Sequence, residues 1–402
     1  MRGFFVLTLS LSLSLSLRAA DWPQFRGPNG AGTSPETNLP TGFTADAGLR
    51  WKVPLPARGL SCPVVVGGRV FITCSGGNKD SRLHVLAFDA GTGAKLWHRQ
   101  FAATGNTNCH PKTCMAAPTP VADANGVYAL FATGDLAAID NDGNLRWYRS
   151  LVEDYPAITN QVGMAASPVL ANGKVIVPMD NNGDSFLAAI DAKTGKNVWK
   201  VDRPRDINWT TPAVRGTGKD AEVLFQAGKE VTVYAADTGE KKAGIPGSGT
   251  IPSPTLADDL LLASGRGGLV AFRYKDGKPE EAWKSTKLAA GTASPVVYQG
   301  RVYAANSSGL VVCGDAKTGN VLWQERIDGP FSASPIAADG KLYVLNEKGK
   351  LTVLKLDSSE GTEVLGTGDM KEEGLATPAI SGGAIFLRGE KSLFCVGPKL
   401  DK

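Results

Sequence analysis

Short apolar runs separated by turn residues follow one another along most of the chain. In one stretch, an apolar run at 293–298 reaches a turn at 299–300, and further runs follow at 301–305, 310–313 and 320–324. Runs of this length at hairpin spacing predict four short antiparallel strands. No amphipathic helical period of useful length interrupts them, so the pattern predicts an all-β protein.

The four-strand unit repeats eight times. Each copy starts with the same mark, which is a small residue, then Ser or Thr (Cys in one copy), then Pro and an apolar run. Successive marks are separated by 57, 48, 44, 42, 41, 40 and 43 residues. Four strands at a period of about 40–45 residues are typical of a propeller blade. The marks end at Pro63, Pro120, Pro168, Pro212, Pro254, Pro295, Pro335 and Pro378.

The last of these units lacks a strand. It spans 376–397 and supplies only three strands, whereas an isolated apolar strand at 49–55 matches the fourth strand of the other units. Pairing of the two completes the blade and removes an exposed sheet edge. We therefore predict an eight-bladed β-propeller of four-stranded antiparallel blades over 49–397, closed by an N-terminal strand. An extended segment at 21–48 precedes it and a tail at 398–402 follows it.

A second motif joins the third and fourth strands of most units. It contains Asp, a turn with Gly, and then Trp. The Asp side chain accepts hydrogen bonds from turn N–H groups, Gly supplies a positive φ, and Trp buries a large ring against the next blade. We interpret these residues as structural: Trp51, Asp89, Trp97, Trp147, Asp191, Trp199, Trp283, Asp315 and Trp323.

The first twenty residues have the features of a secretory signal peptide. Arg2 precedes an apolar run at 4–17, and the small residues Ala19 and Ala20 follow it. Cleavage after Ala19 and cleavage after Ala20 both stay open. No Cys lies near this junction to carry a lipid anchor, and no later stretch has the roughly 18 apolar residues of a membrane span. We expect an exported protein, periplasmic or extracellular, without a transmembrane span.

Composition and charge narrow the class of partner. Lys and Arg number 43 against 39 Asp and Glu, and no block of like charge occurs, so a basic surface for nucleic acid is not expected. Glycine is abundant, with 48 residues, as many tight turns require. We expect a monomer.

Six cysteines in an exported protein permit disulfides. Cys62 and Cys74 flank a hairpin, and a three-residue turn at 67–69 would place them opposite each other, whereas a two-residue turn would not. Cys313 and Cys395 lie in apolar strand patterns and are interpreted as inert core thiols. The candidate disulfides are Cys109 with Cys114 and Cys62 with Cys74.

The repeats resemble those of the pyrroloquinoline quinone (PQQ) propellers. That superfamily includes quinoprotein alcohol dehydrogenases and the outer-membrane assembly lipoprotein BamB. The similarity to secreted PQQ-binding-like repeat proteins of planctomycete-type bacteria covers essentially the whole mature chain, and it implies the fold more than the function. The stretches that carry it, besides the repeats, are 21–28 (DWPQFRGP), 109–112 (CHPK), 183–186 (GDSF) and 208–209 (NW).

The resemblance implies a test for cofactors. Enzymes of the superfamily hold PQQ between a Trp and a disulfide of adjacent cysteines, with calcium bound by Glu, Asn and Asp. This sequence has no adjacent Cys pair and no Cys-x-x-Cys-His motif for haem. His84, His98 and His110 fall in different elements, and the polar run at 180–184 is interpreted as a turn, so no metal site is predicted. We expect no cofactor; PQQ with calcium is the alternative.

Long, varied connections follow the early units, and in a propeller they emerge on one face with the loops between second and third strands. Such loops on a rigid scaffold often carry binding residues. We therefore expect a non-catalytic exported propeller that binds an envelope or extracellular protein or glycan through this face. The alternatives are a PQQ-dependent or sugar-acting oxidoreductase with a divergent site, and an assembly factor similar to BamB. The candidate residues are Arg58, His110, Lys112, Met115, Asn160, Gln161, Asp184, Asn208 and Trp209.

Overall fold

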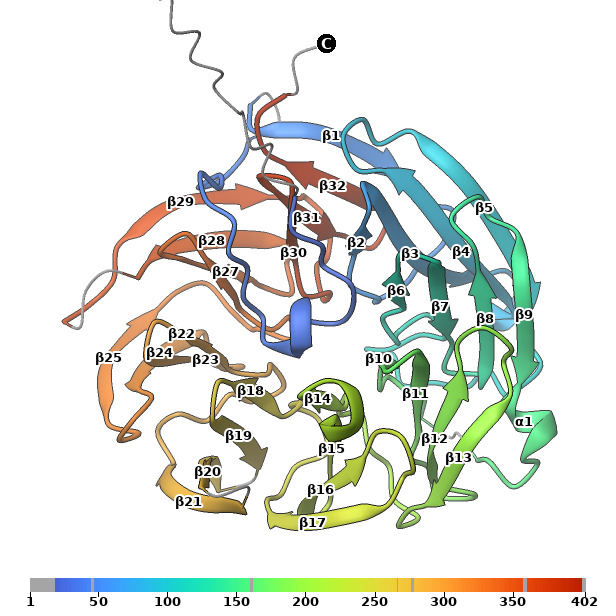
Figure 1. Cartoon of the computed structure of the whole chain (residues 1–402). Helices are drawn as coiled ribbons and strands as arrows, with labels where there is room; N and C mark the ends of the chain where they lie inside the picture. Colours follow the sequence, from blue (N-terminus) through green and yellow to red (C-terminus); the bar gives the residue numbers. More distant parts are fainter. Residues whose placement is uncertain are drawn as a thin grey trace, which may run out of the picture.

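The chain forms a ring of eight four-stranded antiparallel sheets, arranged as blades around a central channel (Figure 1). This computed structural model describes residues 19–44, 47–159, 162–265, 267–275, 278–356 and 360–399. In seven of the blades the strands follow chain order from the channel outward. The predicted all-β, eight-bladed architecture is confirmed. The predicted signal peptide lies, up to residue 18, outside the described residues.

The first four blades are consecutive along the chain. Blade one contains β2 (Val64–Val66), β3 (Arg69–Gly76), β4 (Arg82–Asp89) and β5 (Lys95–Ala102). Blade two contains β6 (Val121–Asp123), β7 (Gly126–Leu130), β8 (Asp135–Ile139) and β9 (Leu145–Ser150). Blade three contains β10 (Val169–Ala171), β11 (Lys174–Met179), β12 (Phe186–Asp191) and β13 (Asn197–Asp202). Blade four contains β14 (Ala213–Arg215), β15 (Glu222–Ala227), β16 (Glu230–Ala235) and β17 (Lys241–Pro246).

The remaining blades continue in order. Blade five contains β18 (Thr255–Ala257), β19 (Leu260–Gly265), β20 (Gly268–Lys275) and β21 (Lys278–Ser285). Blade six contains β22 (Val296–Tyr298), β23 (Arg301–Ala305), β24 (Leu310–Asp315) and β25 (Val321–Arg326). Blade seven contains β26 (Ile336–Ala338), β27 (Lys341–Leu345), β28 (Lys350–Lys355) and β29 (Val364–Asp369). Blade eight contains β30 (Ala379–Ser381), β31 (Ala384–Arg388), β32 (Ser392–Val396) and β1 (Leu49–Pro54).

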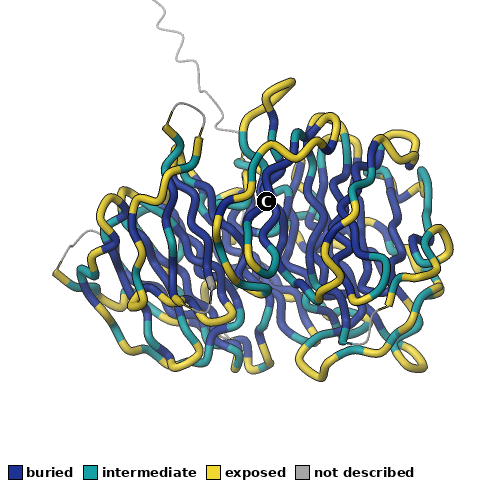
Figure 2. Tube along the Cα trace, turned by 90° about the horizontal axis from the view of Figure 1, so that it is seen from below, coloured by how far each residue is buried: buried dark blue, intermediate teal, exposed yellow. Residues whose placement is uncertain are grey.

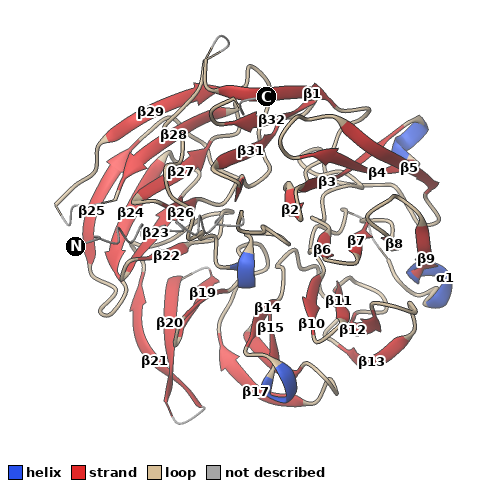
Figure 3. Cartoon of the chain, turned by 45° about the horizontal axis from the view of Figure 1, so that its top comes forward, coloured by secondary structure: helices blue, strands red, loops and turns tan. Residues whose placement is uncertain are grey.

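Helix is scarce in the described chain (Figure 3). One short α-helix lies at the outer edge of blade two, where the Ser150 hydroxyl caps it by accepting the Glu153 N–H. The helical elements are α1 (Leu151–Asp154) and the 3-10 turns η1 (Pro28–Gly30), η2 (Asn78–Asp80) and η3 (Gly218–Asp220).

The ring closes as the strand count predicted. β1 pairs antiparallel with β32, and Trp51 lies opposite Cys395 and Val53 opposite Leu393. One sheet thus joins the two ends of the propeller, and both strands lie side by side at the edge of blade eight (Figure 1). β32 therefore has a paired strand on each side, and its edge is covered.

Burial falls from the channel outward. All five residues of β7 and of β8 are buried, whereas on the outermost strand β5 Trp97 is buried and its neighbours are partly or fully exposed. Figure 2 shows this core as buried tube between exposed turns on both faces. The inner strands therefore read as continuous apolar runs because both of their sides pack against neighbouring blades.

The Ser/Thr-Pro mark of each repeat has a structural reason. The hydroxyl in one blade accepts the main-chain N–H of the equivalent residue in the preceding blade; for example, Ser253 N donates to Ser294 Oγ at 2.9 Å, and Ser294 N donates to Ser334 Oγ at 2.9 Å. In blade one the equivalent residue is Cys62, and Thr377 of blade eight is hydrogen-bonded to its thiol. We call this ring of hydrogen bonds the girdle: Cys62, Thr119, Ser167, Thr211, Ser253, Ser294, Ser334 and Thr377.

The Asp-to-Trp motif joins five of the blades to the next one. In blade one, Asp89 Oδ1 accepts the Thr92 N–H at 2.8 Å and fixes the turn that carries Gly93. The Trp51 ring of blade eight lies against this turn and donates its Nε1–H to the Ala90 oxygen at 3.0 Å. A Cβ at Gly93 would lie 2.7 Å from that ring, so only glycine fits beneath it. Trp97, Trp147, Trp199 and Trp283 make the same bond to the next blade.

Residues 20–44 form a strap that crosses the channel before the chain enters β1 (Figure 1). Trp22 is fully buried and exchanges two main-chain hydrogen bonds with Val65 of blade one, at 2.7 and 2.9 Å. Farther along, Gly32 accepts the N–H of Ala337 in blade seven at 2.9 Å. The segment therefore closes the channel, a role that its polar, irregular sequence did not reveal.

Arg26 holds the strap at the middle of the channel. Its side chain is 1% exposed, and Nη1 donates to Thr255 Oγ1 at 2.9 Å, while Nη2 donates to the Pro295 oxygen. These partners are neutral oxygens on blades five and six. Burial lowers the pKa of Arg26 to about 9.

Candidate functional site

The two faces of the ring differ in construction. One face, which we call the loop face, carries the connections between blades and the loops between second and third strands. The opposite face, which we call the turn face, carries the other hairpin turns and the strap. All of the sequence-predicted candidate residues that the structure describes belong to connections of the loop face. Asn160 and Gln161 lie outside the described residues.

Three long connections of the loop face are bonded to one another. His110 N, in 103–120, donates to the Val162 oxygen of the next connection at 3.0 Å. Trp209 then links to that connection through its indole, which donates to the Gly163 oxygen at 2.9 Å. The main-chain N–H of Trp209 donates to Thr250 O at 2.7 Å. The connections of blades one to four thus form one layer, which we call the platform (residues 103–120, 151–159, 162–168 and 203–212).

Charged side chains tie the platform across the channel mouth. Lys112 Nζ lies 3.0 Å from Glu347 Oε2 in blade seven. Arg58, which follows β1, donates to the carbonyl oxygens of Thr113 (3.2 Å) and Pro111 (3.0 Å). Partial burial alone would raise the pKa of Glu347, but hydrogen bonds from Ser332 and Lys112 lower it overall. Both candidate cations therefore hold loop structure.

The remaining candidates also make internal contacts. Met115 is fully buried, and its carbonyl oxygen accepts the Ala132 N–H at 2.8 Å. Asp184 N donates to Ala157 O at 2.9 Å, which joins the 180–185 loop to the platform. His110 Nδ1 accepts the Lys112 N–H at 3.1 Å and so orders its own turn. The structure gathers these residues on one face, in contact with the scaffold.

A buried ion pair lies beneath the platform. Arg203 donates to both carboxylate oxygens of Asp180, at 2.7 and 3.0 Å, and each side chain is only 2% exposed. Asn208 Nδ2 bonds to the same carboxylate at 3.0 Å and to the Gln226 oxygen at 2.9 Å. Burial alone would lower the pKa of Arg203, but Asp180 and Tyr234 raise it overall. The sequence placed Asp180 in a polar turn and gave no signal for Arg203. Asp180 follows β11 and Arg203 follows β13, so no local pattern links the two residues.

The cysteines are free thiols in the structure. The β2–β3 hairpin has a two-residue turn, with Val66 opposite Arg69, and this register does not bring Cys62 opposite Cys74. Cys109 and Cys114 are likewise unpaired, and the Cys109 thiol lies 3.7 Å from the Thr113 oxygen. Burial raises the pKa of Cys313 to about 11 and of Cys395 to about 12, which leaves both as unreactive thiols.

Two of the three histidines meet although they lie in different strands. The Nδ1 atom of His84 in β4 lies 2.9 Å from the Nε2 atom of His98 in β5. Burial, His98 and Arg82 lower the pKa of His84 to about 4. Within the described ranges, no three His, Cys, Asp or Glu side chains gather as ligands for a metal ion.

The loop face has a depression of about 710 Å³ beside the platform, where connections are short. Its lining comes from blades four to six and is formed largely by small residues: Gly228, Ser248, Gly249, Thr250, Ala289, Ala290 and Gly291. Ile251 stands at this lining with 41% of its surface exposed. Asp206 and Lys229 add one charge of each sign.

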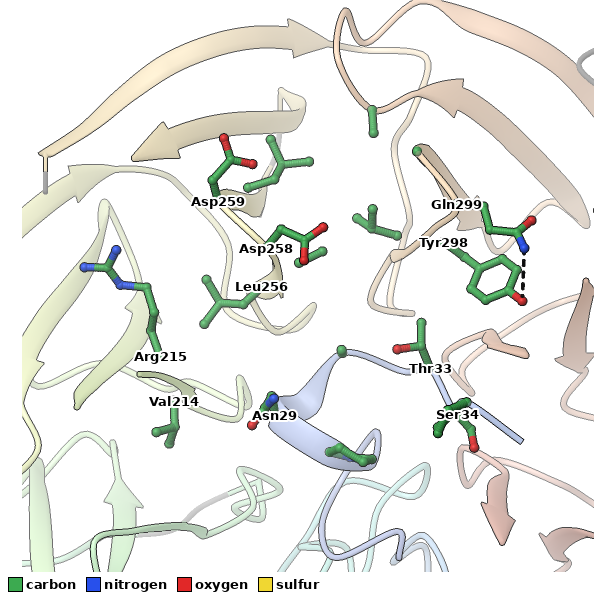
Figure 4. A pocket seen from close by; sticks show the side chains of 18 of the residues that line it. Asn29, Thr33, Ser34, Val214, Arg215, Leu256, Asp258, Asp259, Tyr298 and Gln299 are labelled. Carbon is green, nitrogen blue, oxygen red and sulfur yellow. Dashed lines mark hydrogen bonds between the residues drawn. The ribbon is translucent and has the colours of Figure 1, made fainter. Parts of the chain in front are cut away.

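A second hollow, of about 880 Å³, lies on the turn face between the strap and blades four to six (Figure 4). Asn29 and Thr33 come from the strap, and Asp258 and Tyr298 come from the facing turns. The two arginines in its lining are already paired, Arg215 with Glu222 and Arg273 with Asp259. Sequence reasoning missed this hollow because one wall is the strap.

The linings of the two loop-face cavities, as far as the described residues form them, do not fit PQQ. This cofactor is a flat tricarboxylate, so its binding would require an aromatic ring to stack against it and cations that are not already paired. The described lining of the depression contains no aromatic ring. A smaller cavity of about 390 Å³ beside Arg58 and Lys112 also lacks one, and its Lys112 is paired with Glu347. We therefore derive no redox step through PQQ.

No helix among the described residues is long and apolar enough to cross a membrane.

Comparisons with known proteins agree with this fold. The chain is 26% identical over 170 residues to a polyvinylalcohol dehydrogenase from Pseudomonas sp., which covers 38% of this chain and 24% of that enzyme. It is 27% identical over 236 residues to outer membrane protein assembly factor BamB of Moranella endobia, which covers 56% of this chain and 54% of that protein. The chain thus spans about a quarter to a half of these relatives' length.

Solved structures share the ring. A quinohemoprotein alcohol dehydrogenase from Comamonas testosteroni matches with a TM-score of 0.72 and 15% identity, over 95% of this chain and 81% of that one. This similarity shows the fold alone. The family model described as outer membrane protein assembly factor BamB matches residues 42–178, 157–278 and 266–393, which together cover most of the sequence. The chain belongs to this BamB-type family of PQQ-like β-propellers.

Proposed function

We propose that this chain is an exported, non-catalytic propeller that binds a protein partner through its loop face. The observation that carries the proposal is the depression of about 710 Å³ beside the platform. The bonded connections of the platform stand on one side of it, and mostly small residues line it. Such a shape suits recognition by contact.

The lining favours a polypeptide as the ligand. Small residues such as Ala289 and Gly291 line the depression, so an extended segment can approach the main chain closely and bond to it. The exposed Ile251 side chain supplies an apolar contact for one partner side chain. Lys229 and Asp206 at the lining can orient a partner of mixed charge.

Family membership supports the same role. Several relatives that match most of the chain are named as outer membrane protein assembly factors, and a binding propeller in the envelope is compatible with that name. The basic and apolar sequence at 2–17 supports export. A glycan ligand is the other outcome of the tests below.

The first test places a photo-crosslinking amino acid at position 251 in cells that export the full chain. We expect one envelope protein to be captured there. The matched control is position 145, because Leu145 is a similarly exposed apolar residue (49%) on the outer strand of blade two. With the purified captured protein, Ile251→Asp should weaken binding at least tenfold and Leu145→Asp should not. Equal capture or equal weakening at both positions would refute the proposal.

The second test addresses the oxidoreductase alternative. The purified chain is titrated with PQQ and Ca²⁺ while Trp fluorescence and dye-linked alcohol or aldose oxidation are followed. We expect neither saturable quenching nor turnover. Saturable quenching together with turnover would replace the binding role by an enzymatic one. Binding to a glycan array that Ile251→Asp abolishes would change the partner class and keep the site.

A further inference from the structure

A small site at the start of the described chain binds a main-chain nitrogen. The Glu36 carboxylate in the strap accepts three N–H groups: from Ala20 at 2.8 Å, from Gly382 at 2.7 Å and from Gly383 at 2.6 Å. Gly382 and Gly383 form the turn between β30 and β31 of blade eight. One carboxylate thus fastens both the strap and the beginning of the chain to the last blade.

The residues that follow Ala20 are fixed to blade one. Asp21 Oδ1 accepts the Gly67 N–H at 3.0 Å, in the equivalent turn between β2 and β3. Trp22 is fully buried beside Val65. Ala19, in contrast, is exposed, and Ala20 is half-buried. The chain therefore enters the folded ring at Ala20.

Among the described residues, the Glu36 carboxylate bonds to main-chain N–H groups and to no cationic side chain. A peptide N–H at Ala20 satisfies a lone pair but brings no net charge. Arg50, the cation beside this turn, donates to the carbonyl oxygens of Gly382 (3.4 Å) and Pro398 (2.9 Å) and not to the carboxylate. Asp21 next to Ala20 adds a second negative charge.

We propose that the leader is removed between Ala19 and Ala20, and that the α-ammonium group formed on Ala20 binds Glu36 as an ion pair. Hydrolysis of this peptide bond by a signal peptidase consumes one water and leaves a carboxylate on Ala19 and an amine on Ala20. That amine is protonated at neutral pH, because α-amino groups titrate near pH 7.7–8.0. The peptide N–H already donates to a charged acceptor, and the ammonium group adds an opposite charge on the donor side, as in a charge-assisted pair of two ions.

Neither cut places a small residue at the −3 position, but the two cuts differ in the charge of the residue there. Cleavage here places Ala19 at the −1 position and the apolar Leu17 at −3. Cleavage one residue later would place the charged Arg18 at −3. It would also remove the Ala20 nitrogen from Glu36 and put the ammonium group on Asp21. Maturation between Ala19 and Ala20 therefore completes the anchor of the strap, whereas the later cut dismantles it.

The direct test is the mass of the exported protein. The full chain is produced in a Gram-negative host, and the intact mass and the N-terminal peptide are measured after export. We expect a chain that begins at Ala20. A chain that begins at Asp21, or that keeps the leader, would overturn the proposal.

A four-way comparison tests the ion pair itself. Chains that begin at Ala20, or that carry a Gly-Ser extension before it, are released from a cleavable fusion, each with Glu36 or with Glu36→Gln. With Glu36, the free start should raise the thermal midpoint by about 1–2 °C over the extended start at pH 7. With Glu36→Gln, the two starts should melt together. An equal difference in both backgrounds, or none in either, would show that Glu36 does not bind the ammonium group.

Discussion

Two arginines are buried at different places in the ring, and they are held in different ways. Arg203, beneath the platform of the loop face, lies against the Asp180 carboxylate at 2.7 Å and also bonds to Tyr234. Arg26, in the strap, bonds to a hydroxyl and to carbonyl oxygens. The pKa of Arg203 is raised and that of Arg26 is lowered to about 9, although both side chains are buried.

The difference shows that this fold holds a buried guanidinium group in two ways. Under the platform, a carboxylate compensates the cost of removing the guanidinium from water, so the pair depends on both members. In the channel, hydrogen bonds to neutral oxygens of the neighbouring blades compensate only part of this cost, and burial lowers the pKa of Arg26. The loop face is therefore organised by charge pairs, and the strap is organised by the shape of the channel.

The largest expected effect comes from removing the carboxylate. Asp180→Ala leaves the Arg203 guanidinium buried without its anion, and we expect the free energy of unfolding to fall by about 3–5 kcal/mol. Urea denaturation of the purified chain measures this loss. The double variant Asp180→Ala with Arg203→Met should lie closer to the wild type than Asp180→Ala alone. A double variant that is less stable than the single one would mean that the charge pair is not the source of the loss.

Arg26→Met tests the other solution. Methionine keeps much of the apolar stem and removes the cation without leaving an opposite charge unpaired, so we expect a smaller loss of about 2–3 kcal/mol from the broken hydrogen bonds and packing. The control is Arg146→Met, because Arg146 is only half-buried and bonds to Tyr128 at the outer side of blade two. A loss larger than that of Asp180→Ala would contradict the distinction between the two sites.

The girdle supplies a neutral reference for both sites. Ser294→Ala leaves the Ser253 N–H without its acceptor in the buried inner ring, and we expect a loss of about 1–2 kcal/mol. Cys62→Ser, at the equivalent position of blade one, replaces a thiol by the hydroxyl that the other blades use and should leave the unfolding midpoint within error or raise it. If Cys62→Ser were as damaging as Ser294→Ala, the two positions would not be equivalent.

The histidine pair extends the comparison to a base that titrates near neutral pH. The pKa of His84 is about 4 in the folded chain, below its ordinary value of 6.5. The unfolded chain therefore binds more protons between these values, and stability is lost as the pH falls from 6.5 toward 4. Besides His98, the charged groups that lower this pKa include Arg82. His84→Gln should flatten this part of the stability–pH curve, measured by thermal melts at several pH values; an unchanged slope would assign the dependence to other groups.

Local sequence was sufficient for the parts of the molecule that repeat. The mark that ends at Pro295 and the Asp315-to-Trp323 motif each place a hydrogen-bonding group next to an apolar run. The mark recurs in every blade, and the Asp-to-Trp motif recurs in most of them. The strand at 49–55 could be assigned to the last blade because a strand count leaves one edge unpaired. Eight blades, their order and their closure follow from these patterns.

The parts that do not repeat needed the tertiary structure. Asp180 and Arg203 stand at the ends of different strands, and nothing local identifies one as the partner of the other. The candidates Arg58, Lys112 and Trp209 are gathered on one face as expected, but the fold engages their polar groups in holding loops. The strap crosses the channel only because Trp22 and Arg26 find places between blades that are far apart in sequence. The periodic pattern of the sequence thus determined the ring. Contacts between non-repeated segments that are far apart in the sequence decided the strap, the platform and the hollows. Such contacts depend on where closure of the ring brings the blades together.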